Sequence, residues 1–248
     1  MLTPAIPSHY HSDNVTIRGM FIRQVVAFRR AMATLESYYE KLTSGSLPSS
    51  TSNPTHPYMT SYTPAGSSGP VLFEYTECLP GRLVFFGHSD KDGLLCIKFT
   101  RHYSKEVHEF CAKEGFAPRL HAIEYLPDGW QMVVMEDVRA DYVNLKTFLL
   151  SNVDPSQRDS LLGNIRRSLV KLHQAGFVHG DIRDVNILVE ESGLDGTFLL
   201  VDFEMGGEIG KAVYPPLMNT TSVTRPGGVW ENELVLAEHD MAMVDFFT

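Results

Sequence analysis

The chain contains the stretch His179-Gly180-Asp181-Ile182-Arg183-Asp184-Val185-Asn186-Ile187-Leu188-Val189 and, shortly after it, Leu199-Leu200-Val201-Asp202-Phe203-Glu204. The acid Asp181 is followed five residues later by the amide Asn186, which precedes an apolar run. A second acid, Asp202, follows the next apolar run. Acids and amides at the ends of paired apolar strands can meet at one cleft. The order and spacing therefore predict a site for a metal ion and a hydroxyl group, although each short motif alone is common by chance.

The composition is that of an ordinary globular protein. The chain has 248 residues, of which 43% are hydrophobic and 21% are charged. This length can bury a full core, as one large domain or two small lobes. The formal net charge of −9 argues against a nucleic-acid binder or a binder of anionic membranes, because both partners favour a basic surface.

The cysteines and the apolar runs bear on location. Cys78, Cys96 and Cys111 are odd in number and lack metal-type spacing, which indicates reduced thiols and neither a disulfide framework nor a zinc site. No apolar run reaches the length of a membrane span, and the first twenty residues lack the features of a signal peptide. We therefore expect an intracellular protein, cytoplasmic or nuclear, without a transmembrane segment.

The first 70 residues divide into two parts. In the N-terminal segment, 1–42, we expect an amphipathic helix over 16–42 because apolar residues recur three and four positions apart; they are Phe21, Val25, Phe28, Met32, Leu35, Tyr39 and Leu42. We favour docking of this helix on its own domain over a membrane surface or a partner protein. Residues 43–70 contain no Lys, Arg, Asp or Glu and are rich in Ser, Thr, Pro and Gly. This composition predicts a flexible linker.

Short strand patterns begin at Val71. We expect strands at 71–75, 82–86, 94–99, 119–125 and 131–136, with one helix over 103–114 that stops at Gly115. Together they predict a five-stranded antiparallel sheet. Asp154 and Pro155 suit the start of a second helix, which continues to near Gly176, and we expect little helix after Asp202. The fold class is therefore α+β.

The candidate site has the residue types that phosphoryl transfer from ATP requires. The protein contributes mainly positioning and electrostatics to this reaction. Asp181 is the candidate for orienting the acceptor hydroxyl and accepting its proton. Asn186 and Asp202 are candidate ligands of Mg²⁺, which prefers oxygen. Arg183 is the candidate for neutralising the transferred phosphoryl group, whereas we expect a structural role for His179.

A lysine and a connecting strand complete the predicted nucleotide site. Lys98 follows an apolar strand and is the candidate phosphate anchor, which needs a carboxylate to orient it. The following helix offers Glu106 and Glu109, of which we favour Glu106. The strand 132–135 leads into 136–138, where the backbone of Glu136 and Val138 is expected to pair with adenine. Val134 and Met135 would add apolar contacts to the base.

These residues resemble the protein-kinase-like superfamily, and most closely its fungal-type protein-kinase-like proteins. The resemblance covers roughly 71–245. It is carried by Lys98-Phe99-Thr100, Glu106-Val107-His108, Ala117-Pro118-Arg119-Leu120, Val133-Val134-Met135-Glu136, His179-Gly180-Asp181-Ile182-Arg183, Arg225-Pro226 and His239-Asp240. It implies a bilobal fold that binds ATP and Mg²⁺ between an N-lobe at 71–138 and a truncated, mostly helical C-lobe at 139–248. It also implies that Lys98, Glu106, Asp181, Asn186 and Asp202 are the catalytic and nucleotide-binding set.

The sequence departs from that pattern in four places. Residues 78–87 lack the glycine-rich loop that would cover the phosphates, and Glu204 stands where the pattern has glycine. Gly180 replaces the arginine before the catalytic acid, and only 46 residues follow Asp202. Two hypotheses remain: a kinase that phosphorylates a hydroxyl of a protein or small molecule, or a pseudokinase that acts as a binding or scaffolding module. If the motif matches were accidental, Lys98 and Asp202 would lie far apart.

Overall fold

A computed structural model describes residues 15–43, 57, 59–67, 69–151, 153–192, 196–216, 218–219 and 222–247. The chain divides into two compact units, Met1–His56 and Pro57–Thr248. In the first unit, helix α1 spans Val15–Thr43, so the helix expected at 16–42 forms. Several of its large apolar side chains, among them Phe28 and Leu35, are exposed.

The second unit begins inside the segment expected to be a linker. Residues 44–56 of that segment lie outside the described residues, but Ser61–Tyr62 form strand β1, which pairs antiparallel with β2, Val71–Leu72. The Tyr62 ring is buried, and its hydroxyl donates to Asp92 Oδ2 at 2.5 Å. The linker prediction was therefore wrong at this end, because one aromatic ring anchors an otherwise polar stretch in the core.

The expected five-stranded antiparallel sheet is present, in the order β3-β4-β5-β7-β6. Its strands are β3 Glu74–Cys78, β4 Val84–Ser89, β5 Gly93–Thr100, β6 Leu120–Tyr125 and β7 Gln131–Glu136. The strand expected at 71–75 is split at Phe73 into β2 and β3, which belong to different sheets. The turn at 127–129 is a 3₁₀ turn, η1 Pro127–Gly129.

Alternation along the strands gives this sheet two faces. Leu95 and Ile97 of β5 belong with Val134 of β7 to a cluster that also includes Tyr62. Their sequence neighbours point to the opposite face. Met135 of β7 joins the main core there, and Lys98 of β5 lies on the same side as Cys96.

Helix α2, Lys105–Lys113, follows β5 and ends where expected, with Gly115 at φ +84°. After β7 the described chain forms β8 Tyr142–Asn144, α3 Leu145–Leu150, α4 Pro155–Gln174, β9 Phe177–Val178, β10 Ile187–Glu190, β11 Phe198–Leu200 and β12 Gly207–Glu208. Strands β11, β10 and β8 form a three-stranded sheet, and β12 pairs with β9. Asp154 caps α4 as predicted, accepting from the Ser156 amide at 2.8 Å.

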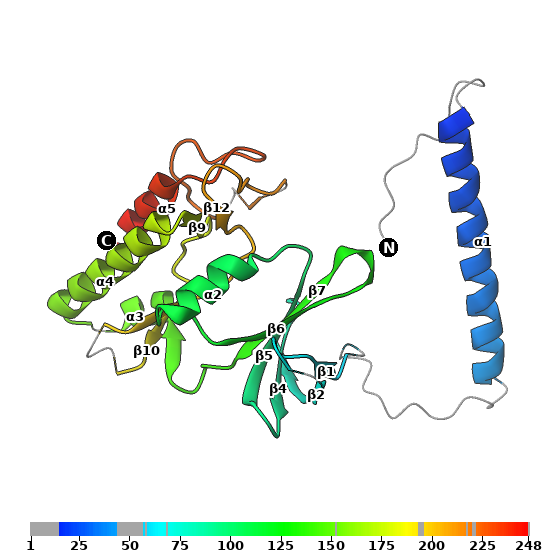
Figure 1. Cartoon of the computed structure of the whole chain (residues 1–248), viewed down its shortest axis with the longest axis horizontal. Coiled ribbons are helices and arrows are strands. Elements are labelled where there is room, and N and C mark those ends of the chain that lie inside the picture. The colour runs from blue at the N-terminus through cyan, green and yellow to red at the C-terminus, as the bar shows by residue number, and fades with distance from the viewer. Residues whose placement is uncertain are drawn as a thin grey trace. The chain divides into compact units, whose positions relative to one another are not determined.

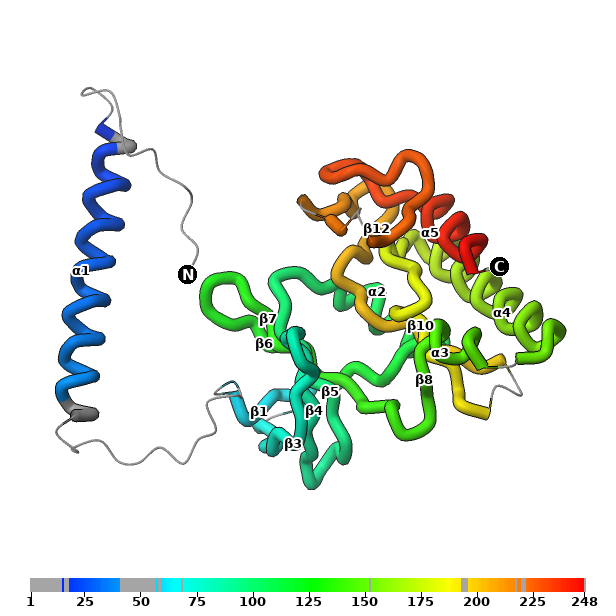
Figure 2. Tube along the Cα trace, turned by 180° about the vertical axis from the view of Figure 1, so that it is seen from behind, coloured from blue at the N-terminus to red at the C-terminus, as the bar shows by residue number. Residues whose placement is uncertain are grey.

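The chain ends in a helix that the sequence pattern did not predict. Helix α5, Ala237–Val244, packs beside α4 and leads into η2, Asp245–Phe247 (Figures 1 and 2). Two of its four buried residues, His239 and Asp240, are polar, so the apolar period that identifies a helix is weak. With its short strands and long loops, the part after Val138 is also less helical than expected.

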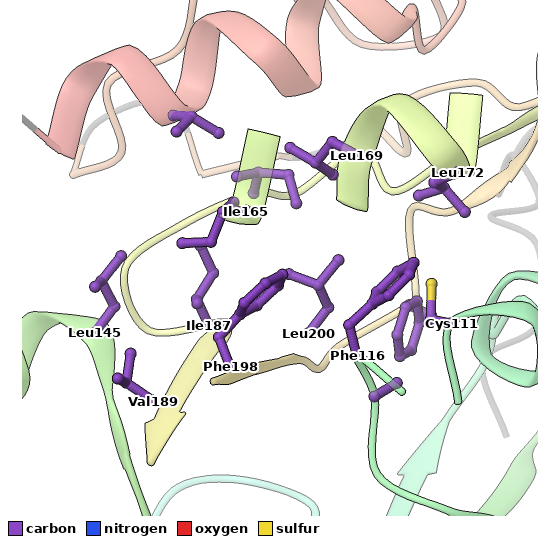
Figure 3. Packing of buried hydrophobic residues seen from close by; sticks show 14 of the residues in the cluster. Cys111, Phe116, Leu145, Ile165, Leu169, Leu172, Ile187, Val189, Phe198 and Leu200 are labelled. Carbon is purple, nitrogen blue, oxygen red and sulfur yellow. The ribbon is translucent and has the colours of Figure 1, made fainter. Parts of the chain in front are cut away.

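The main core joins these elements beneath the candidate site. Side chains of α4 meet those of β10 and β11 in one cluster, which also receives residues of α2 and α3 (Figure 3); examples are Cys111, Leu145, Ile165, Leu169, Ile187 and Leu200. Burying a side chain of this size contributes about 1.5–3 kcal/mol. This core fixes the two short strands whose ends carry Asn186 and Asp202.

Candidate active site

Lys98 and Asp202 meet although 104 positions separate them in the sequence. The Lys98 ammonium donates to Asp202 Oδ1 at 2.7 Å, and Glu204 Oε1 lies 2.8 Å from the same Nζ. Within the described ranges, these two carboxylates are the ones within ion-pair distance of Lys98. One cation thus faces two anions on the inner face of the large sheet.

The charges at this cluster stabilise each other's ionised forms. Burial acts to lower the pKa of Lys98, but Asp202 and Glu204 outweigh it and hold that pKa above its usual value. Burial likewise acts to raise the pKa of Asp202, and Lys98 outweighs it, so that pKa lies below its usual value. Both groups are therefore charged at neutral pH.

The segment after β11 places Asp202 by an unusual backbone turn. Asp202 has φ +71°, a conformation that costs about 1 kcal/mol for a residue other than glycine and is often found at functional sites. Phe203 is fully buried and stacks on His108 of α2, with ring centroids 4.7 Å apart. Because Phe203 points into the core, Asp202 and Glu204 on either side of it face Lys98.

Asp181 is buried among three donors. Asn186 Nδ2 donates to its Oδ2 at 2.8 Å, and Arg183 Nη2 lies 2.7 Å from the same oxygen. Arg225, from the tail, donates to Oδ1 at 2.9 Å. The loop that contains Asp181 is fixed by Asp240 of α5, which accepts from the backbone amides of His179 and Gly180, each at 2.8 Å.

Two predictions about this loop concern structure. The amide of Asp181 donates to His179 Nδ1 at 3.2 Å, which fits the structural role expected for His179. Gly180 has φ +80°, and a Cβ there would lie 2.7 Å from the carbonyl oxygen of Met205. Glycine at 180 is therefore required by the turn and by this close approach.

A cavity of about 600 Å³ opens beside Lys98 and Asp202, within the usual size range of small-molecule sites, about 300–1,000 Å³. Of the predicted site residues, it is lined by Lys98, Met135, Glu136, Val138, Asn186 and Asp202. Leu79, Gly81, Arg82 and Leu83, in the turn between β3 and β4, line it as well. This turn thus covers the cavity where a glycine-rich loop was missing from the sequence.

Two predicted residues lie elsewhere. Val134 is fully buried on the other face of the sheet, in the cluster with Ile97, so the expected contact with a nucleotide was wrong. Strand alternation places Met135 at the cavity and its neighbour away from it. Glu106 is exposed and lines a separate hollow with Phe177 and Lys211, so the expected pair with Lys98 is not formed.

The residues at the cavity suit a magnesium ion. Asn186 uses its Nδ2 to donate to Asp181, which leaves Oδ1 as a possible ligand. Asp202 bonds Lys98 through Oδ1, which leaves Oδ2 as a second one. Mg²⁺ is commonly held by one or two carboxylates together with substrate phosphates. The described residues contain no cluster of three or more His, Cys, Asp and Glu that could hold a metal, but a set of one amide and one carboxylate does not need such a cluster.

Sequence reasoning missed two contributors to the site. Glu204 was seen only as a departure from a glycine, although its spacing of two from Asp202 was visible. Arg225 was assigned to holding the tail together, and its contact with Asp181 spans 44 positions that contain little regular structure. No local pattern in the sequence could predict that pairing.

No protein-family model matches the chain, and no curated protein sequence matches it either. Among the described helices, none has the length and apolar character needed to cross a membrane.

Proposed function

We propose that this protein is an ATP- and Mg²⁺-dependent phosphotransferase with a bilobal, protein-kinase-like fold. The observation that carries the proposal is the Lys98–Asp202 bond at the wall of a nucleotide-sized cavity that also includes Asn186. Accidental motif matches would have left these residues far apart. The large sheet, 71–138, would form one lobe and 139–248 the other.

In this proposal the nucleotide occupies the cavity. The amides of Glu136 and Asp137 already donate to the carbonyls of Arg119 and Leu94, so the Val138 amide is the donor that we assign to adenine. Met135 contacts the base, and Lys98 binds the phosphates. Mg²⁺ held by Asn186 and Asp202 would neutralise charge on the phosphate oxygens.

The remaining residues act on the acceptor. A hydroxyl oxygen forms a bond to the γ-phosphorus while the bond from that phosphorus to the β-phosphate oxygen breaks. Asp181 orients the hydroxyl and accepts its proton, and ADP leaves with the electron pair of the broken bond. Arg183, already beside Asp181, offsets the charge on the transferred group. The hydroxyl belongs to a protein or a small molecule.

A second candidate function has its own supporting observation. Asp181 is only 4% exposed in its side chain, and both of its oxygens already have partners. A carboxylate in this state would serve a pseudokinase, a binding or scaffolding module in which no proton transfer occurs. It predicts partner binding that does not change in Asp181→Asn.

Transfer of the labelled γ-phosphate of ATP distinguishes the two. Purified protein is incubated with Mg·ATP and a panel of protein and small-alcohol acceptors, with water as the default acceptor. The enzyme proposal expects turnover that Asp181→Asn lowers about 100-fold or more. Turnover that is absent, or equal in both proteins, would reject it.

A further inference from the structure

The carboxylate that aims Lys98 at the cavity comes from an unexpected part of the chain. Glu204 Oε1 lies 2.8 Å from Lys98 Nζ, and the two side chains are 38% and 15% exposed. Both residues line the cavity. Lys98 is thus held between Asp202 and Glu204 at the place where phosphates would bind.

The backbone around Glu204 is anchored to the loop that leads from β5 into α2. The Ser104 amide donates to the carbonyl of Phe203 at 3.0 Å. The Glu204 carbonyl is hydrogen bonded to the His102 ring. Because Lys98 lies on β5 a few residues before this loop, both ends of the Lys98–Glu204 pair are fixed to the same part of the structure.

The carboxylates of α2 do not have this geometry. Glu106 lines a separate hollow, and Glu109 lies 3.6 Å from Lys105 in an exposed pair on its own helix. Reorienting α2 would therefore leave the Lys98–Glu204 contact in place.

We propose that Glu204 is the positioning residue for Lys98, in place of a carboxylate on α2. The inference rests on the proposed function, in which Lys98 binds the phosphates of ATP. While Glu204 holds the ammonium toward the cavity, Asp202 keeps an oxygen for Mg²⁺. Phosphate binding at this site is then independent of the position of α2.

A double-mutant cycle tests the contact without any nucleotide. Urea midpoints are measured for Glu204→Gln, Lys98→Met and the double variant, with Glu106→Gln as the matched control on α2. We expect Glu204→Gln to lower the midpoint in the natural background but not in Lys98→Met, while Glu106→Gln has the same effect in both. A Glu204 effect that is the same in both backgrounds, or a coupling of Lys98 to Glu106, would overturn the proposal. Glutamine has the shape of glutamate, so the variant is expected to fold.

Binding of ATP then tests the role. Calorimetric titration is expected to show about tenfold weaker binding for Glu204→Gln and no change for Glu106→Gln. In turnover, we expect KM for ATP to rise while kcat is largely kept. If no protein binds ATP, the proposed function fails while the cycle still decides the Lys98–Glu204 contact. If ATP binds and only Glu106→Gln weakens it, the positioning proposal fails and the proposed function stands.

Discussion

Asp181 is the most heavily engaged side chain of the candidate site, and its two arginines are not equivalent. Arg225 is 7% exposed and bonds Oδ1, whereas Arg183 is 24% exposed and bonds Oδ2, which Asn186 also contacts. The Nε of Arg225 is buried without a hydrogen-bond partner within the described structure. Arg225 therefore contributes mainly through Asp181.

This difference predicts unequal losses of stability. Removing one partner of a buried ion pair costs about 3–5 kcal/mol, so Arg225→Met is expected to lower the free energy of unfolding by about 3 kcal/mol. Arg183→Met is expected to cost about 1 kcal/mol, because the pair is partly exposed and Asn186 still bonds the same oxygen. Urea unfolding of both variants measures this. Equal losses would show that the tail arginine is not the main partner of Asp181.

Gly180 gives a second prediction, with a control of similar backbone conformation. Gly180→Ala is expected to cost at least about 3 kcal/mol, since it adds a clash with Met205 to the cost of a positive φ. Gly81 has φ +72° and open space around its added Cβ, so Gly81→Ala is expected to cost about 1–2 kcal/mol. Thermal unfolding of both variants measures the difference. If alanine costs the same at both positions, the close approach at Gly180 has no energetic weight.

Helix α2 is tied to the site through His108, which is buried and neutral. Its Nε2–H donates to the Pro118 carbonyl at 2.8 Å, and its Nδ1 accepts from the Tyr103 hydroxyl at 2.8 Å. Burial lowers the pKa of His108 to about 4, against about 6.5 in the unfolded chain. The unfolded state therefore binds more protons between these two pH values, and stability falls as pH is lowered from about 6.5 to about 4.

His108→Gln removes this titration while keeping one donor and one acceptor. The natural protein is expected to lose about 3 kcal/mol across the window from this one group. The variant is expected to show a shallower decline over the same range. Urea unfolding at a series of pH values measures both slopes. Parallel slopes would mean that His108 is not responsible for the loss.

Single elements show what the sequence could and could not predict. Strand β5 was predictable because its apolar residues alternate and two of them are completely buried. The same alternation, applied to β7, would have excluded Val134 from the cavity. Helix α5 was missed because it buries His239 and Asp240, which a search for apolar periodicity does not count. Asp240 is buried to accept two backbone amides of the Asp181 loop, so the polar character that hid the helix serves the site.

Across the larger unit, Pro57–Thr248, the motif spacing predicted which residues would meet but not every partner. Lys98, Asn186 and Asp202 line one cavity as the spacing predicted. The pairing of Lys98 with Glu204 and of Asp181 with Arg225 depends on the turn at Asp202 and on the path of the tail. Such long-range packing has no local signature in a single sequence.

Binding of Mg·ATP is the measurement that tests the central proposal most directly. Calorimetric titrations compare the natural protein with Asp202→Asn, each with ATP in the presence of Mg²⁺ and in the presence of a chelator. We predict that Mg²⁺ strengthens ATP binding by the natural protein and that Asp202→Asn loses most of this gain, about tenfold in affinity. Failure of the natural protein to bind Mg·ATP, or an identical gain from Mg²⁺ in both proteins, would contradict it.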